Sequence, residues 1–182
     1  MNDSSTPTDT PFWRFSLQFY RQSGVSDACI ALQDEYGVDV NLLLFLLWLA
    51  AAGRQLSADD VRMLDDKVAK WRDLTVVPIR DTRRKLKSAR TLVEPLQQEA
   101  FRTKIKAIEL EAERLQQQAL HALAQSAPLG RPSAARDAAH ANVCAYEHIL
   151  DATFPRNVVA ILRDAFDSMP KGERAAAAAV RE

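Results

Sequence analysis

A run of basic side chains between residues 80 and 90 is the part of this sequence whose spacing best suits binding. The positions recur at three- and four-residue intervals, which places them on one face of a helix. Such a face can neutralise phosphates or dock an acidic protein partner. No aromatic residue alternates with the basic positions, so base stacking is not indicated. This basic face consists of Arg80, Arg83, Arg84, Lys87 and Arg90.

Three interpretations of the basic face are open. It is solvated or paired with acids of the same chain, it binds an acidic protein, or it binds nucleic acid. The net charge of the chain is zero, but residues 61–106 hold 13 basic and 6 acidic groups, whereas residues 1–60 hold 3 and 8. The acids available for internal pairing are Asp34, Glu35, Asp59 and Asp60.

A second group of reactive side chains lies between residues 137 and 151. His140, Cys144 and His148 share one helical face with two aspartates, and imidazole and thiolate groups are metal ligands. One straight helix cannot close a tetrahedral site, because residues eight apart lie about 12 Å from each other. The simpler interpretation is a polar outer stripe. We therefore predict no metal site and no cofactor, with these three residues as the weak candidates.

The sequence contains no recognisable catalytic motif. It has no glycine-rich phosphate loop, no nucleophile elbow, no zinc-hydrolase signature and no paired-cysteine motif. We assign no catalytic residue and favour a non-enzymatic protein, although chemistry based on carboxylates alone is left open. Trp13, Trp48 and Trp71 each lie in an apolar helical pattern, which predicts core positions. A small enzyme or ligand carrier with a pocket lined by these tryptophans is the third alternative.

The most apolar segment, from Leu42 to Ala52, is eleven residues long. A helix of that length rises about 16 Å, whereas the bilayer core is roughly 30 Å thick, so we expect a buried helix rather than a membrane span. Asp39 or Asn41 is placed to cap this helix, although a buried Asp39 could instead be a polar anchor or a site acid.

Other helices are predicted from apolar spacing and from capping residues, which are Thr10, Ser26 and the Ser57–Asp60 capping box. The apolar spacing after Pro78 places Val93 on a line that faces the core. The helical pattern should be interrupted at Val77-Pro78. Pro95 should either kink the following long helix or begin a new one. After Pro95 the apolar positions follow a heptad spacing, which predicts a helix that packs back on the bundle or self-associates through residues 101–122. Those heptad positions are Phe101, Ile105, Ile108, Ala112, Leu115, Ala119 and Ala122.

The helical patterns and the single proline- and glycine-containing linker predict an all-α protein. We expect a compact helical bundle with a long, kinked or interrupted helix and a C-terminal helical pair. The predicted parts are a disordered N-terminus at residues 1–10, a bundle at 11–125, a linker at 126–133, the helical pair at 134–170 and a tail at 171–182.

Three sequence blocks, FWRFSLQFY, GVSDACIALQDEYGVDVNLLLFLLWLAAAG and WRDLTVVPIRDTRRKLK, support a family assignment in combination. Over roughly residues 11–125 the chain resembles an uncharacterised family of short bacterial helical proteins, a domain of unknown function. The resemblance implies an all-helical, soluble bacterial protein, and it implies no activity, ligand or catalytic residue.

The N-terminus has no secretory pattern, and two cysteines form no disulfide framework, which favours the cytoplasm. We therefore expect a non-enzymatic protein–protein interaction module. The basic face indicates that its protein partner is acidic. The alternative is a nucleic-acid or ribosome-associated protein that uses the same basic face.

Overall fold

The structure, a computed structural model, describes residues 10–169 and divides the chain into two compact units. Unit 1 comprises residues 1–65 and 117–182, and unit 2 comprises residues 66–116. Within residues 10–169 the regular elements are helices, apart from one pair of two-residue strands, which confirms the predicted all-α fold. The predicted tail at residues 171–182, and all but the last residue of the predicted disordered N-terminus, lie outside the described residues.

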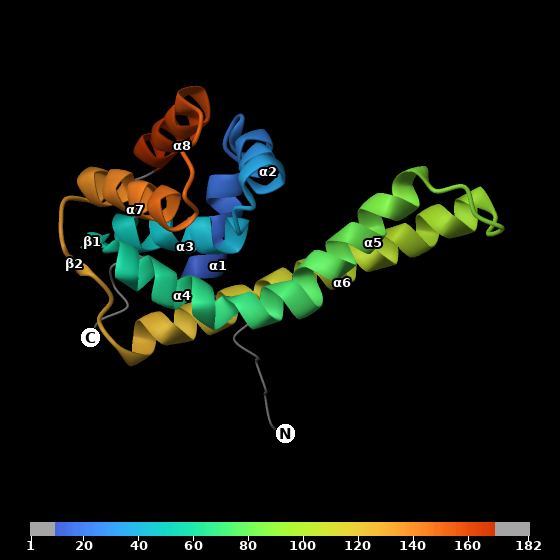
Figure 1. The fold of residues 1–182 in the computed structure, drawn as a ribbon, viewed down its shortest axis with the longest axis horizontal. Coiled ribbons are helices and arrows are strands. Elements are labelled where there is room, and N and C mark those ends of the chain that lie inside the picture. The colour runs from blue at the N-terminus through green and yellow to red at the C-terminus, as the bar shows by residue number, and fades with distance from the viewer. Residues whose placement is uncertain (1–9, 170–182) are drawn as a thin grey trace, which may run out of the picture. The chain divides into compact units, whose positions relative to one another are not determined.

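Helix α3, Val40–Ala51, is the central element of unit 1 (Figure 1). Every residue from 41 to 51 is buried, which confirms the predicted core helix and explains its apolar character on all sides. Asp39 is the N-cap, and its side chain accepts hydrogen bonds from the backbone N–H groups of Asn41 and Leu42. No described helix combines the length and the apolar character needed to cross a bilayer.

Four helices surround α3 directly or through a neighbour. They are α1 (Pro11–Tyr20), α2 (Val25–Tyr36), α7 (Ala135–Ile149) and α8 (Arg156–Ser168). Helices α1, α2 and α7 pack on α3, with α7 making the largest contact, and α8 packs on α2 and α7. The C-terminal helical pair is thus part of the core of unit 1.

The starts of these helices test the predicted caps. Thr10 caps α1 as predicted, because its side chain accepts a hydrogen bond from the Trp13 N–H and Pro11 occupies the first helical turn. The predicted cap of α2 at Ser26 is wrong. Gly24 is the N-cap there, with a φ of 77° that suits glycine and no capping side chain.

The region predicted as a linker is held to unit 1 by a short strand pair. Strand β1 (Arg54–Gln55) pairs antiparallel with β2 (Arg131–Pro132). Beside it, the side chain of Asn142 on α7 donates to the carbonyl groups of Leu46 and Arg54 and accepts from the Leu56 N–H. Asn142 is fully buried, and through these three hydrogen bonds its amide group ties α7 to α3 and to the strand that follows α3.

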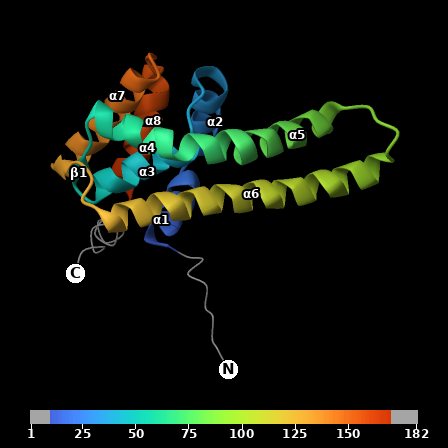
Figure 2. The same cartoon turned by 60° about the horizontal axis from the view of Figure 1, so that its bottom comes forward.

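Unit 2 contains an antiparallel helical hairpin (Figure 2). Helix α4 (Ala58–Trp71) leads through a π-helical turn (Arg72–Val76) into α5 (Val77–Ser88). A loop at residues 89–94 then reverses the chain into α6 (Pro95–Ser126). The α5–α6 hairpin is defined here as α5, this loop and residues 95–116 of α6.

The two prolines of this region act differently from each other. The predicted break at Val77-Pro78 is wrong, because the helical path continues there: the preceding turn widens to a π-helix and Pro78 occupies the first turn of α5, where an N–H is not needed. Pro95 is a new first turn rather than a kink, since α6 begins at that residue after the loop.

The apolar core of unit 2 is small. Among residues 66–116, the buried apolar side chains are those of Val68, Val76, Ile105 and Ala112. Trp71, which was predicted to be part of the core, is exposed, and its indole N–H donates to the carbonyl of Ala112 at 3.0 Å. Its side chain thus covers α6 from outside, because a two-helix hairpin has no third layer to bury a large ring.

Candidate functional site

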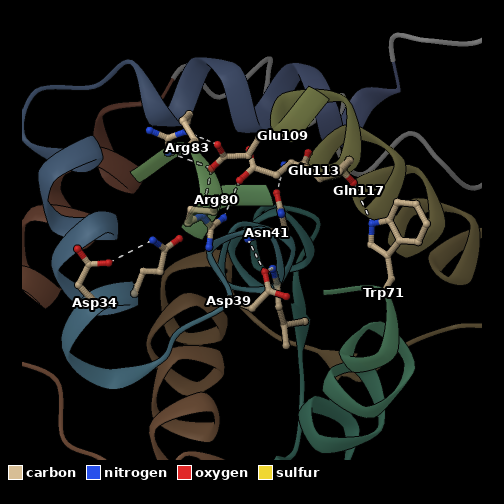
Figure 3. A network of polar contacts seen from close by, with 12 residues as sticks. Asp34, Asp39, Asn41, Trp71, Arg80, Arg83, Glu109, Glu113 and Gln117 are labelled. Carbon is tan, nitrogen blue, oxygen red and sulfur yellow. Dashed lines mark hydrogen bonds and ion pairs between the residues drawn. The ribbon is translucent and has the colours of Figure 1, made fainter. Parts of the chain in front are cut away.

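The basic face predicted from the sequence lies on α5 and continues into the following loop, and the structure divides it in two. Its first part points at α6 (Figure 3). Arg80 pairs with Glu109 at 3.2 Å and with Glu113 at 2.7 Å. Arg83 pairs with both carboxylate oxygens of Glu109. The acidic residues that pair with these two arginines therefore come from α6, and not from residues 1–60 as the sequence suggested.

This cluster is a partly buried ion-pair network. The Glu109 side chain is 7% exposed, and those of Arg80 and Arg83 are 15% and 23% exposed. Burial opposes ionisation of the Glu109 carboxyl, but hydrogen bonds and charge from Arg83 and Arg80 outweigh it and hold its pKa below the ordinary value. The same hydrogen bond raises the pKa of Arg83. The network fixes α5 against α6 and removes two cations from the surface available to a partner.

The second part of the basic face is exposed. Arg84 and Lys87 lie in the last turns of α5, and Arg90 lies in the loop that follows. Lys87 is close enough to Glu99 to lower the pKa of that carboxyl, after the larger effect of Arg102. The positive charge that a partner could meet is thus concentrated towards the loop end of the hairpin.

Apolar side chains project from the same end. Leu92 is fully exposed, Leu96 is 81% exposed and Val93 is 52% exposed. These three residues form what is called here the hairpin tip. The apolar spacing of the sequence predicted Val93 on the buried line of α5, which is wrong because α5 ends at Ser88 and the chain turns away.

Side-chain hydrogen bonds hold the loop in a defined conformation. The Gln98 amide group donates to the carbonyls of Leu86 and Ala89 at 2.8 and 3.0 Å, which satisfies the end of α5. Thr91 accepts from the Val93 N–H, and its hydroxyl donates to the Gln98 side chain at 2.6 Å. The tip is therefore displayed on a fixed loop.

The exposed large apolar side chains of the described residues gather on unit 2. Ile30 is the one in unit 1, whereas unit 2 has ten. Single exposed leucines are common in proteins, but within the described residues unit 2 has a concentration of exposed apolar side chains that unit 1 lacks. The ten residues are Trp71, Leu74, Val77, Leu92, Val93, Leu96, Phe101, Ile108, Leu110 and Leu115.

The heptad positions of α6 are helical as predicted, but their seam is divided. Ile105 and Ala112 are buried, while Phe101, Ile108 and Leu115 are exposed. The alternation follows from the helix, because residues seven apart stay on one line and the two lines of a heptad seam lie side by side. Between residues 101 and 115 one line faces the interior and the other is uncovered, whereas Ala119, farther along the first line, is exposed.

The predicted group on α7 lies beside a cavity between α7 and α8. The sulfur of Cys144 is 3.8 Å from a ring nitrogen of His140, and both residues line the cavity, whose volume is about 620 Å³. Burial and the nearby Glu147 raise the pKa of the Cys144 thiol, so the thiol stays protonated rather than acting as a nucleophile. Within residues 10–169 no three His, Cys, Asp or Glu side chains are placed to hold a metal ion, and His148 does not line the cavity.

The cavity is a feature that sequence reasoning missed. Its apolar wall comes from Leu47 on α3, Val143 on α7, and Leu162 and Phe166 on α8. Each of these residues fits an ordinary helical core pattern, and only the packing of α8 across α7 shows that they also border open space. None of the three tryptophans lines this cavity.

Two other predicted positions have structural roles. Trp48 is buried against Phe12 and Phe45, with ring centroids 5.5 and 5.6 Å apart, so it belongs to the core of unit 1. Asp39 is a helix cap, as the capping interpretation predicted, and its own N–H donates to the hydroxyl of Tyr146 at 2.9 Å.

The comparisons with known proteins give a family and name no chemistry. No curated protein and no solved structure matches the chain. A family model described as "Protein of unknown function (DUF2390)" matches residues 11–120. The match covers more than half of the 182 residues and confirms the predicted resemblance to an uncharacterised family. The chain therefore belongs to the DUF2390 family of proteins of unknown function.

Proposed function

We propose that this protein is a non-enzymatic protein-interaction module whose docking element is the tip of the α5–α6 hairpin. The partner is an acidic protein segment that also presents apolar side chains. The observation that supports this proposal is the presence of three exposed apolar side chains and three exposed cations at one end of the hairpin, on the loop and the adjoining turns of α5 and α6. These are the tip residues Leu92, Val93 and Leu96, and the basic residues Arg84, Lys87 and Arg90.

Burial of the hairpin tip against the partner supplies the affinity in this proposal. Fully burying a leucine side chain is worth roughly 1.5–3 kcal/mol, so covering Leu92 and Leu96 would provide a substantial part of a micromolar binding energy. Residues 66–116 bury few apolar side chains of their own. Because the loop is held by Gln98 and Thr91, little conformational freedom remains to be lost on binding.

The basic residues beside the hairpin tip select the partner in this proposal. Arg84, Lys87 and Arg90 would attract acidic side chains and speed association, in a manner that weakens as salt rises. Nucleic acid is the less favoured partner, because Arg80 and Arg83 already neutralise Glu109 and no aromatic residue alternates with the basic positions. We also propose a cytoplasmic location, which the free and exposed thiol of Cys144 supports, since reduced thiols persist there.

The test is an affinity purification of the tagged full-length chain with matched variants. Leu92→Ser with Leu96→Ser removes the apolar tip, and Lys87→Glu with Arg90→Glu reverses the exposed charge. Leu110→Ser, an exposed leucine of α6 outside the tip, is the control. We expect both double variants to keep the wild-type melting curve and lose a specific acidic protein, while the control retains it.

Two results would overturn the proposal. One is an unchanged set of co-purifying proteins for both double variants when their melting curves are normal. The other is recovery of RNA as the bound species, with binding that falls steeply as salt rises and is insensitive to the leucine changes. In that case the nucleic-acid alternative would replace it.

A further inference from the structure

The uncovered line of the α6 heptad seam has an apolar side chain at its centre and at each end. Phe101, Ile108 and Leu115 lie seven residues apart and are 57%, 57% and 40% exposed. On the same face, Lys104 lies between the first two and Glu111 between the last two, and both are exposed. These five residues, all in unit 2, are called here the α6 stripe.

The stripe alternates apolar and charged side chains symmetrically about Ile108. Phe101 precedes Ile108 by seven residues and Leu115 follows it by seven. Lys104 precedes Ile108 by four residues and Glu111 follows it by three, so their charges are opposite across the centre. The stripe therefore complements a copy of itself that is turned about a two-fold axis, and such self-complementarity is what an isologous homodimer requires.

We propose that a second copy of this chain binds the stripe, with the two α6 helices antiparallel and the two-fold axis at Ile108. In this arrangement Phe101 of one copy packs on Leu115 of the other, and Ile108 packs on its counterpart. Lys104 of each copy faces Glu111 of the other. The proposal deepens the proposed function by assigning one surface of the same hairpin to self-association and leaving the tip for a different partner.

Charge selects the antiparallel arrangement. Lys104 and Glu111 flank the apolar line on the same side, so in a parallel pair each would face the opposite flank of the partner helix and the two would not meet. An antiparallel pair brings the two like flanks together, so that Lys104 of each copy lies near Glu111 of the other. Glu111 also pairs with Arg114 on its own helix, but that contact is exposed and leaves the carboxylate at the surface.

The size of the stripe sets the expected strength. Stable interfaces involve roughly 20–30 residues from each partner, and the stripe offers far fewer. The dimer is therefore weak and its population depends on concentration. A weak, reversible dimer is compatible with a module that also binds another protein through its tip.

Sedimentation velocity of the full-length protein over a range of concentrations tests the proposal. We expect reversible dimerisation that Lys104→Glu or Glu111→Lys weakens about tenfold each, because two attractive contacts per dimer become repulsive. Mixing the two single variants should restore association, since each then offers the charge that the other needs. The double variant Lys104→Glu/Glu111→Lys should also dimerise like the wild type.

Disulfide trapping adds a measurement of direction. In a Cys144→Ser background, where the remaining cysteine, Cys29, is buried, Ile108→Cys should form a disulfide-linked dimer on mild oxidation. Phe101→Cys should not, because in an antiparallel pair two copies of residue 101 are about 21 Å apart along the helices.

Several results would overturn the proposal. They are a monomer at every concentration, single reversals that dimerise as well as the wild type, a mixture that fails to restore association, or trapping of residue 101 as fast as residue 108. The tip variants of the affinity purification leave the stripe intact, so loss of tip binding with normal dimerisation, or the reverse, shows which of the two proposals has failed.

Discussion

The Glu109→Gln substitution tests the division of the basic face into a paired part and an exposed part. It keeps the shape of the side chain but removes the charge that Arg80 and Arg83 share. An amide also places two N–H donors where Arg83 needs an acceptor. Both guanidinium groups remain in a partly buried position with less to neutralise them.

The expected cost follows from burial. Removing one partner of a buried ion pair costs about 3–5 kcal/mol, but here Arg80 keeps Glu113 and both arginines reach some solvent. We therefore expect the hairpin to lose about 2–3 kcal/mol, which corresponds to roughly a 30- to 150-fold loss of amide protection. The change should be confined to α5 and residues 98–116 of α6.

Hydrogen exchange at neutral pH, resolved by peptide, is the appropriate assay. Glu99→Gln is the matched control, because Glu99 also pairs with an arginine but is solvent-exposed, and it should leave exchange unchanged. Exchange in α3 of unit 1 should not change in either variant. Equal protection of the hairpin in the Glu109→Gln and Glu99→Gln variants would refute the ion-pair account.

The same carboxylate gives a pH dependence with a definite sign. The folded state holds the pKa of Glu109 below its ordinary value of 4.5, so the unfolded chain binds the proton first on acidification. The contribution to hairpin stability is complete above that value and is lost as pH falls through the lower folded pKa. Urea unfolding below pH 4.5 should therefore show a steeper loss of stability in the wild type than in Glu109→Gln.

Three predictions concern unit 1. Asn142→Ala should lower the free energy of unfolding by about 1–3 kcal/mol in urea titrations, because it leaves the buried Leu56 N–H without its acceptor. Gly130→Ala should cost about 1–3 kcal/mol, since φ is 62° and the new methyl group would lie 2.3 Å from the Gln55 carbonyl oxygen; an unchanged melting temperature would contradict this. Burial beside Trp48 lowers the pKa of His121, so stability should fall below about pH 6.5, and His121→Gln should flatten that fall in thermal scans.

The parts of the fold that the sequence predicted are those set by local physics. The apolar run of α3 is long enough for a core helix and too short for a bilayer, and Asp39, one of the two predicted capping residues, is its N-cap. Ser57 and Asp60 form the reciprocal hydrogen bonds of a capping box for the same local reason.

The parts that could not be predicted depend on how distant segments meet. Glu109 lies 26 residues beyond Arg83, and only the reversal at residues 89–94 brings the two together. Asn142 looks like one polar position on an amphipathic helix, and only the packing of α7 on α3 brings its side chain to the Leu46 carbonyl and to the segment after α3. Pro78 has no N–H to donate, and the π-helical turn before it allows the helical path to continue all the same. The local sequence does not show whether the chain will continue in this way or end the helix.

The exposed surface of the hairpin could also be predicted only in part. Heptad spacing predicted a helical seam on α6, but a sequence pattern cannot tell which line of the seam the protein itself covers. Ile105 is buried and Ile108 is not, although both satisfy the same pattern. The tip was hidden for a related reason, since Val93 continues the apolar line of α5 in sequence but lies beyond its end in space.

Site-specific photo-crosslinking in living cells tests the central claim, that the hairpin tip is the docking element, most directly. A photoreactive phenylalanine analogue would replace Leu96 at the tip or, as the control, Ile30, the exposed large apolar residue described in unit 1. We expect a protein adduct at position 96 whose crosslinked peptide is acidic and apolar. That adduct should be lost when Lys87 and Arg90 are changed to Glu, and no adduct should form at position 30. An adduct at position 30 but not at position 96, or one at position 96 that survives the charge reversal, would contradict the central claim.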